Sequence, residues 1–434
     1  MSIFSSLFTG VSGMRSNERG FGVIGDNIAN MNTVGFKGSR AIFADVLNQT
    51  VLGSAGVTAD LGQGSIVGGI QNVMTQGSLL QTGVTTDLAI GGNGFFIVEG
   101  KAGGLEGNFY TRNGQFRIDN EGFLTNSSGL YLQGFPADEQ GNINAAMSKL
   151  QVGSAQSPPV PTTDVELGIN LDPNEPINAA PFDPVNPETT SAFSTSVPMY
   201  DSLGNSHDVE VYFQHTGPGQ WNWFAQVDGA DIEGGTPGTP FSITSGSLIY
   251  NTDGVLDQEI HNVGPPAPVQ FVGATSQDLN LDFGSSLTTD AGDGSGSTSF
   301  AGGSTVNTVV QNGFGAGSLT HITVNESGRI DGTFSNGDNR VLGGLAVALF
   351  QGQDALRAVG GNLLSAGPEV SEPIIGNPNA GGRGLIFSGS LEQSNVDLTN
   401  EFTQMIVTQR GFQASSRTVT TGNEMLTELV NLIR

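Results

Sequence analysis

At 434 residues, the chain is long enough for two to four domains with cores of their own. It has 65 glycines, many in Asn-Gly, Asp-Gly and Gly-Gly pairs typical of tight turns between short strands, and it has no Cys, which excludes disulfides, thiol nucleophiles and zinc–thiolate sites. The net charge of −26 disfavours binding to nucleic acid or to an anionic membrane, and no stretch approaches the ~18 consecutive apolar residues of a membrane span.

The first stretch predicts a helix with a narrow apolar stripe, expected over residues 1–32. Apolar residues recur at intervals of seven: Leu7, Met14, Phe21 and Ile28. A seven-residue repeat is typical of a helix that packs into a coiled-coil-like seam. The same stretch has no basic n-region and no long apolar run, so we expect no classical signal peptide.

A connector and a β-domain are expected next. Residues 33–80 are punctuated by glycines and lack a sustained helical period, which predicts an extended connector with short strands. We expect this connector to let the following domains shift relative to the helix. In residues 81–150, Asn113-Gly114 separates two strand-like runs, and Phe116 and Ile118 alternate with polar residues as in a half-buried strand. This segment is therefore expected to belong to an inner β-domain.

The middle of the chain predicts an inserted domain over residues 151–318. Between Lys149 and Arg329 there are 20 acidic side chains and no Lys or Arg. Such a segment is expected to be an outward-facing, self-repelling β-domain; the alternative is a generic solvated acidic surface without a function. Residues 319–394 again show the hairpin pattern and the charge balance of residues 81–150. We therefore expect them to complete the inner β-domain.

The end of the chain, residues 395–434, predicts a second helix with the same stripe. Its apolar positions at intervals of seven are Leu398, Met405, Phe412, Val419, Leu426 and Ile433. Ser394, with Asp397 three residues later, is a predicted N-cap. A companion row of positions lies four residues after each stripe residue. Its polar members are expected to fix the register of the seam: Gln409, Ser416 and Asn423.

Pairing the first helix with the last is the simplest way to bury both stripes, because one helix with a thin apolar seam has little to hold it together in water. The alternative is that each helix packs separately on a globular core. The expected fold is therefore mainly β with α-helical termini. The helices pair in a coiled-coil-like inner domain, followed outward by two β-domains nested by insertion.

No constellation for catalysis, metal binding or cofactor binding is found in the sequence. The histidines lack metal-ligand spacing and are interpreted as structural or surface residues: His207, His215, His261 and His321. Asp290 and Asp293 lie among glycines, but the ordered pattern of a calcium loop is missing. A set of aromatic residues forms either part of the hydrophobic core under the strands or a face that stacks on glycans: Tyr212, Phe213, Trp221 and Trp223. We therefore expect no enzyme activity and no cofactor.

Four stretches of the chain resemble the bacterial flagellar rod and hook proteins. Ser12-Gly13-Met14 and the segment from Asn27 to Lys37 are similar to the N-terminal signature of that family. The signature positions are Asn27, Asn30, Asn32, Gly35 and Phe36. The segments TDLAIGGNGFFIV and YTRNGQFRIDNEGFL resemble the inner-domain motifs of the family, and residues 389–432 resemble its closing segment.

Within this family the large insertion, which contains MYDSLGNSHDVEVYF, resembles the outer domain of hook proteins, whereas distal-rod proteins lack a large insertion. The resemblance implies a structural hook subunit that assembles with copies of itself into a curved, flexible tube joining rod to filament. The stripe residues of both helices would form its assembly interface. Two alternatives stay open: a distal-rod-like structural protein, and a secreted carbohydrate-binding or adhesive module.

The resemblance also implies partners and a location. The partners are the rod, hook-cap and hook–filament junction proteins and the flagellar type III export apparatus, with no nucleic acid and no membrane insertion. The location is extracellular, on the flagellar hook and basal body, after export without a cleaved signal peptide.

Overall fold

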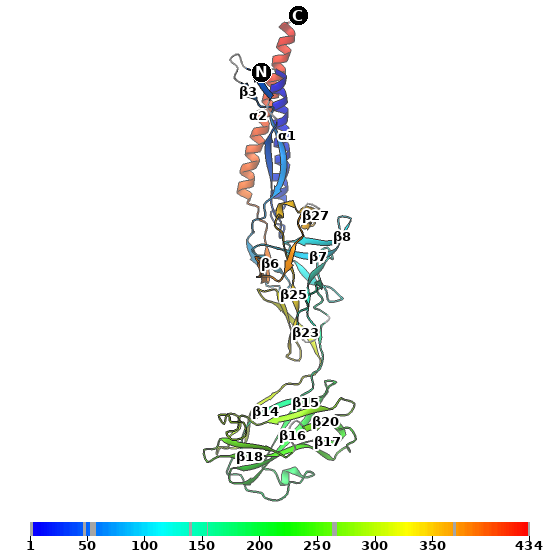
Figure 1. Cartoon of the computed structure of the whole chain (residues 1–434), viewed down its shortest axis with the longest axis vertical. Coiled ribbons are helices and arrows are strands. Elements are labelled where there is room, and N and C mark those ends of the chain that lie inside the picture. Colours follow the sequence, from blue (N-terminus) through cyan, green and yellow to red (C-terminus); the bar gives the residue numbers. More distant parts are fainter. Residues whose placement is uncertain are drawn as a thin grey trace. The chain divides into compact units, whose positions relative to one another are not determined.

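The computed structural model describes residues 3–46, 49–52, 58–138, 141–153, 155–262, 267–367 and 370–432. Ile433 of the predicted stripe therefore lies outside the described residues. The chain divides into two compact units (Figure 1). Unit 1 comprises residues 1–155, 321–332 and 340–434, and unit 2 comprises residues 156–320 and 333–339. The sequence-based boundaries of the inserted domain were 151 and 318.

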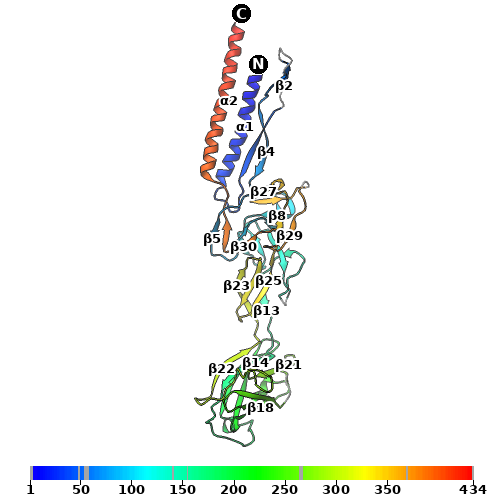
Figure 2. The same cartoon turned by 60° about the vertical axis from the view of Figure 1, so that its left-hand side comes forward.

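Two α-helices lie side by side in unit 1, α1 (Ile3–Ala29) and α2 (Leu398–Leu432) (Figure 2). The predicted pairing of the terminal helices is thus confirmed. Helix α1 ends three residues before the expected position 32 because the chain turns there. Phe36 N donates to Thr33 O at 3.2 Å, and Gly35 has a φ of +70°, a conformation that favours glycine.

Helix α2 begins directly after Asp397, whose carboxylate caps it. Asp397 Oδ1 accepts hydrogen bonds from Thr399 N at 2.8 Å and from Asn400 N at 3.4 Å. The predicted cap at Ser394 is wrong, because the Ser394 hydroxyl instead accepts from Val396 N in the turn before the helix. An acidic N-cap also interacts favourably with the helix dipole.

The connector after α1 contains short strands, as expected, and they pair into ribbons. Strand β1 (Ser39–Asp45) pairs antiparallel with β4 (Ser65–Asn72), and β2 (Gln49–Leu52) pairs with β3 (Thr58–Leu61). The ribbon is held against α1, since Ser16 Oγ donates to Ser65 O at 2.8 Å and Gly20 packs on Phe43. The expected shift of the β-domains relative to the helices stays a prediction.

The β-domain of unit 1 is built from two distant stretches of the chain. The first contributes β5 (Leu79–Gln81), β6 (Leu88–Gly91), β7 (Phe95–Ala102), β8 (Leu105–Thr111), β9 (Phe116–Ile118), β10 (Leu124–Asn126), β11 (Tyr131–Pro136) and β12 (Ser148–Lys149). The second contributes β25 (Asn339–Leu345), β26 (Val347–Leu349), β27 (Arg357–Gly360), β28 (Leu363–Ser365), β29 (Ile374–Gly376), β30 (Leu385–Ser388) and β31 (Ser390–Glu392). Between them, β23 (Gly317–Val324) and β24 (Arg329–Phe334) form a hairpin shared by both units.

Pairing between the two stretches closes this domain. Part of the main sheet runs in the order β25-β11-β7-β8-β28-β27, while β30 pairs with β6 and β31 pairs with β5. The centre is strand β7, where Phe95, Phe96 and Ile97 are at most 1% exposed. Segments separated by more than 200 residues thus share one core, and this brings the end of β31 beside the start of the chain's connector.

Unit 2 contains two sheets that share a second core. Its strands are β13 (Gln156–Ser157), β14 (Asp164–Asn170), β15 (Phe193–Tyr200), β16 (Ser206–Gly217), β17 (Gln220–Asp228), β18 (Pro240–Tyr250), β19 (Leu256–His261), β20 (Ala267–Val269), β21 (Gln277–Asp282) and β22 (Thr305–Gln311). One sheet is the antiparallel meander β15-β16-β17-β18-β19, and the other has the order β20-β21-β14-β22. Trp221 and Trp223 are fully buried between them, with Phe213 and Phe283.

Across the described ranges, no helix is both long and apolar enough to cross a membrane.

Candidate assembly site on the paired terminal helices

The two helices approach each other closely because glycines lie at their contact. A Cβ added to Gly10 would lie 2.8 Å from Val419 Cγ2, and one added to Gly422 would lie 2.8 Å from Leu7 Cδ2. Further pairs continue the same antiparallel register: Gly13 with Ser415, Asn17 with Gly411, Gly20 with Thr408, and Asn27 with Glu401. The row of α2 that faces α1 is therefore mostly small or polar, with Val419 as its apolar member.

The predicted apolar stripe contributes Leu7 and Val419 to this contact. Most of its described members are half-buried: Leu7, Met14, Ile28, Leu398, Met405, Val419 and Leu426. The two phenylalanines of the stripe are more exposed, Phe21 at 44% and Phe412 at 42%. They line a cavity of about 250 Å³ on the helix pair. Of the polar companions, Gln409 and Asn423 are exposed and Ser416 is half-buried. The register of the pair is thus set by the glycine and Asn positions.

Many other apolar side chains on the helices are exposed. They are Phe4, Phe8, Phe402, Ile406, Val407, Met425, Leu429, Val430 and Leu432. The last turns of α2 extend beyond the first turn of α1, as Figure 2 shows, and Leu432 there is 83% exposed. Exposed apolar surface of this extent is typical of sites of association.

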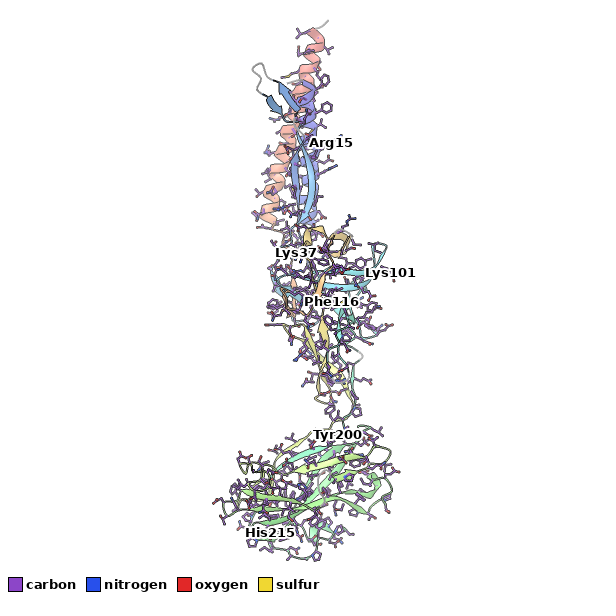
Figure 3. The ribbon with its side chains drawn as sticks, viewed as in Figure 1. Arg15, Lys37, Lys101, Phe116, Tyr200 and His215 are labelled. Carbon is purple, nitrogen blue, oxygen red and sulfur yellow. The ribbon has the colours of Figure 1, made fainter. Side chains whose placement is uncertain are left out.

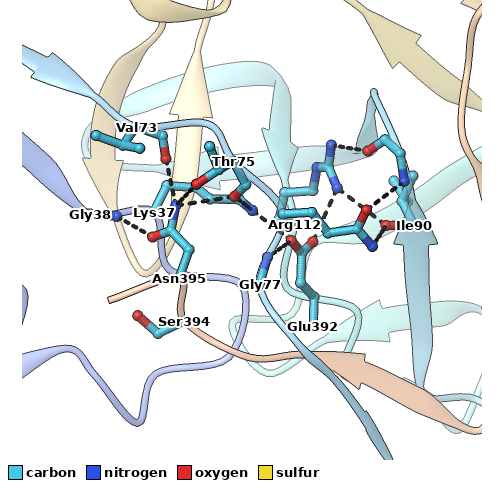
Figure 4. A network of polar contacts seen from close by, with 12 residues as sticks. Lys37, Gly38, Val73, Thr75, Gly77, Ile90, Arg112, Glu392, Ser394 and Asn395 are labelled. Carbon is cyan, nitrogen blue, oxygen red and sulfur yellow. Dashed lines mark hydrogen bonds and ion pairs between the residues drawn. The ribbon is translucent and has the colours of Figure 1, made fainter. Parts of the chain in front are cut away.

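A buried ion cluster joins the ends of both helices to the β-domain (Figure 4). The carboxylate of Glu392, the last residue of β31, is fully buried. It accepts from Lys37 Nζ at 2.6 Å, from Gly77 N at 2.9 Å and from an Arg112 guanidinium nitrogen at 3.1 Å. Lys37 lies where the helix pair meets the strands of the β-domain (Figure 3). One carboxylate therefore fixes three separate segments of the chain.

Burial works against the charges of this cluster. It lowers the pKa of the Lys37 ammonium and of the Arg112 guanidinium, and in both cases the nearby Glu392 carboxylate opposes the shift. The side chains of Lys37 and Arg112 are 7% and 4% exposed. Their remaining hydrogen bonds go to carbonyl oxygens, Thr75 O for Lys37, and Ile90 O and Gly92 O for Arg112. Removal of Glu392 would leave two buried cations without a counter-ion.

Two asparagines complete the connection between the helices and the β-domain. Asn27, 2% exposed, donates to Ser39 O at 2.8 Å and to Glu401 Oε1 at 3.0 Å, and its Oδ1 accepts from Ser39 N. Asn395, just before α2, accepts from Gly38 N at 2.8 Å and donates to Val73 O at 2.7 Å. The side-chain amide of each asparagine thus forms hydrogen bonds with backbone N–H and C=O groups where a helix joins the ribbon.

The other signature positions have different surroundings. Gly35 N donates to Glu392 O at 2.7 Å, and a Cβ on Gly35 would lie 2.5 Å from the Arg112 carbonyl carbon, so only glycine fits. Asn30 Nδ2 donates to Asp26 O in the last turn of α1. Phe36 is half-buried, whereas Asn32 is exposed and no contact explains it.

Sequence reasoning missed Arg112, Glu392 and the inter-helix glycines. Arg112 lies beside the Asn113-Gly114 turn, and Glu392 lies within the closing motif, but no spacing rule connects residues 280 positions apart. The glycines did carry a signal, since Gly13, Gly20 and Asn27 are themselves spaced by seven.

Unit 2 offers no catalytic or glycan-stacking arrangement at the residues singled out in the sequence. Trp221 and Trp223 are fully buried, so a stacking face built on them is wrong. His215 stacks on Trp221, and His207 lies between Asp201 and Asp231. In the part of the chain that the structure describes, no three His, Cys, Asp or Glu side chains are grouped to hold a metal.

The Asp290 and Asp293 carboxylates, considered for calcium, form local turn contacts instead. Asp290 accepts hydrogen bonds from the backbone and hydroxyl of Ser286, and Asp293 accepts from Ser295 N.

Comparison with known proteins gives four matching family models. Their descriptions and matched ranges are Flagella basal body rod protein (7–37), Flagellar hook protein FlgE/F/G D1 domain (89–156), Flagellar basal body protein FlaE D2 domain (170–314) and Flagellar basal body rod FlgEFG protein C-terminal (388–432). A solved structure of the Helicobacter pylori flagellar hook protein FlgE2 aligns with a TM-score of 0.46 at 17% identity, covering 72% of this chain and 100% of that one.

Similar curated proteins span the whole chain. The flagellar hook protein FlgE of Treponema pallidum is 34% identical, with 99% of each chain covered. That of Escherichia coli is 33% identical over 97% of this chain and 98% of its own, and that of Borreliella burgdorferi is 33% identical over 98% and 99%. This chain belongs to the flagellar hook protein FlgE family.

Proposed function

We propose that this chain is the structural subunit of the flagellar hook and that its paired terminal helices join copies into the tube. The tube is curved and flexible, and it acts as a universal joint that carries torque from rod to filament. The family membership supports the hook, and the helix pair supports the route of assembly.

The exposed apolar surface of the helix pair is the observation that carries this proposal. Phe402, Ile406 and Val407 on α2 are between 48% and 62% exposed, and Phe4 and Phe8 on α1 are more than 60% exposed. Neighbouring copies would remove these side chains from water, and apolar burial is the main favourable term in association. The predicted stripe residues would lie at the same interface, on the edges of each pair.

The ion cluster around Glu392 suits a part that transmits torque. It holds α1, α2 and the ribbon to the β-domain through buried, charge-assisted hydrogen bonds, which are stronger than neutral ones. Flexing of the tube would therefore come from sliding between copies rather than from loosening inside unit 1.

The implied partners and location follow from the same proposal. A hook subunit meets rod proteins at one end of the tube and hook-cap and junction proteins at the other, and it reaches its extracellular place through the flagellar type III export apparatus. The relatives are named as hook proteins, and two of the matched models are described as basal body rod proteins, which supports this placement.

Substitution at the helix surface tests the assembly route. Phe412→Asp places a charge on the open edge of the helix pair and should prevent tube formation by the purified chain, observed by negative-stain electron microscopy. Gln404→Asp is the matched control, since it places the same side chain at an exposed polar position of α2 and should leave assembly intact. Normal tubes from Phe412→Asp would contradict the proposed interface.

A further inference from the structure

Unit 2 has a cavity of about 530 Å³ on the face of its five-stranded sheet that points away from the core. Strands β16 and β17, which are neighbours in Figure 1, form its floor, and residues 185–189 and 238–240 form its walls. Asp208, Glu210 and Tyr212 alternate along β16 with side chains of the core, as the two faces of a strand require.

The cavity is lined by acidic side chains and by no basic ones. The carboxylates are Glu188, Asp208, Glu210 and Asp228. Unit 2 contains no Lys or Arg, so none of these carboxylates has a lysine or arginine partner within the unit. Asp228 is engaged locally, accepting from Ala230 N and Gly238 N at 2.9 Å, and Glu210 accepts from the Tyr212 hydroxyl. Acidic residues alone do not define a binding site.

Gln226 supplies an independent observation. It lines the cavity from β17, is only 4% exposed, and its Nε2 has no hydrogen-bond partner within the described part of the chain. Gln226 pairs directly with Glu210 across the two strands, so both side chains lie on the cavity face. Buried amide groups almost always have a partner, and one without a partner is destabilising. An oxygen acceptor from outside unit 2 would satisfy it.

We infer that this cavity binds an organic cation with an oxygen acceptor next to it, which is the chemistry of an arginine or lysine residue within a peptide. The cationic group pairs with Glu188, Asp208 and Glu210, and the carbonyl oxygen accepts from Gln226 Nε2. A guanidinium group suits this arrangement especially, because its planar fork binds carboxylates through two hydrogen bonds.

A second copy of this chain is the source that the charges favour. All 15 Lys and Arg residues lie in unit 1, while unit 2 is exclusively acidic among its Asp, Glu, Lys and Arg residues. Basic side chains of one copy and the cavity of another are therefore complementary. A free basic peptide has the same chemistry and is the other source. The choice of a second copy rests on the proposed self-assembly; the binding site itself does not.

Titration of the unassembled full chain tests the site. N-acetyl-L-argininamide should bind by calorimetry, and its uncharged isostere N-acetyl-L-citrullinamide should not. Glu210→Gln should weaken argininamide binding about tenfold or more, as loss of a charge-assisted hydrogen bond implies. Glu166→Gln is the matched control: Glu166 is an exposed acid of β14 outside the cavity, and its change should leave binding unaltered.

Gln226→Leu separates recognition from folding. It removes the unpartnered donor, so argininamide binding should weaken while the unfolding midpoint of unit 2 stays level or rises. Both tryptophans lie in unit 2, and their fluorescence reports that midpoint. Equal binding of argininamide and citrullinamide would overturn the site, as would unchanged binding in both Glu210→Gln and Gln226→Leu.

A second titration identifies the source of the cation. If a neighbouring copy fills the cavity, assembled tubes should no longer bind argininamide. Tubes that bind it as well as free subunits would overturn the second-copy assignment and leave a free peptide as the ligand. A chain that forms no tubes would count against the proposed function, while the titration of free subunits would still decide whether the site exists.

Discussion

At the scale of single residues, Glu392 is the side chain on which most connections depend. Its two oxygens serve Lys37, Gly77 and Arg112, and its backbone oxygen accepts from Gly35. Isolated buried cations are very costly, so the three charges are best understood as a set whose members stabilise one another. The N-terminal and C-terminal signature segments each supply one part of this cluster, Lys37 and Glu392.

Glu392→Gln should destabilise unit 1 by about 3–5 kcal/mol, the usual cost of breaking a buried ion pair. Hydrogen exchange of the amides in β6 and β7 measures the loss. Trp fluorescence should show unit 2 unfolding at an unchanged denaturant concentration, because both tryptophans lie there.

The control for this substitution is a surface ion pair of the same type. Lys101 and Glu106 are 3.1 Å apart and 75% and 71% exposed. Exposed pairs contribute about 0–1 kcal/mol, so Glu106→Gln should change exchange very little. If the Glu392 and Glu106 substitutions had equal effects, the cluster would not have the structural role assigned to it.

At the scale of elements, the sequence predicts both terminal helices but not the residues between them. A seven-residue apolar repeat identifies a helix face, yet glycines at the same spacing decide how closely two helices approach. Gly10 faces Val419 and Gly422 faces Leu7, so these two members of the apolar stripe pack against glycines in the contact. Helix propensity disfavours mid-helix glycine, and at Gly10 and Gly422 the close contact between the helices explains its presence.

Two glycines of α1 should therefore respond to alanine in opposite ways. At Gly22 an added Cβ meets nothing within 4 Å, so Gly22→Ala should stabilise α1 by about 1 kcal/mol through helix propensity. At Gly10 the added Cβ would lie 2.8 Å from Val419 Cγ2 and 3.3 Å from Ser415 O, so Gly10→Ala should push the helices apart and destabilise the pair.

Hydrogen exchange of the α1 amides distinguishes the two glycine variants. Slower exchange in Gly22→Ala together with faster exchange in Gly10→Ala is expected. An equal gain in protection in both variants would mean that the helices are not closely packed at Gly10.

At the scale of the whole molecule, the order of segments could be predicted from the sequence, but their contacts could not. The absence of Lys and Arg from 150 to 328 and the return of balanced charge afterwards indicate an insertion, and the structure places a compact unit at 156–320. The pairing of β31 with β5, or of β30 with β6, joins strands about 300 residues apart, which local patterns do not encode. The sequence predicts short strands in this connector but not the pairing of β1 with β4. Exposed Ile42 and Ile70 lie on opposite faces of this ribbon, so the polar–apolar alternation of a surface strand is blurred.

Electron microscopy of flagella sheared from the source cells, labelled with an antibody against unit 2, tests the central claim most directly. If the chain is the hook subunit, the label will be confined to the short curved segment between basal body and filament. Label on a straight rod, or on no flagellar structure at all, would contradict that account.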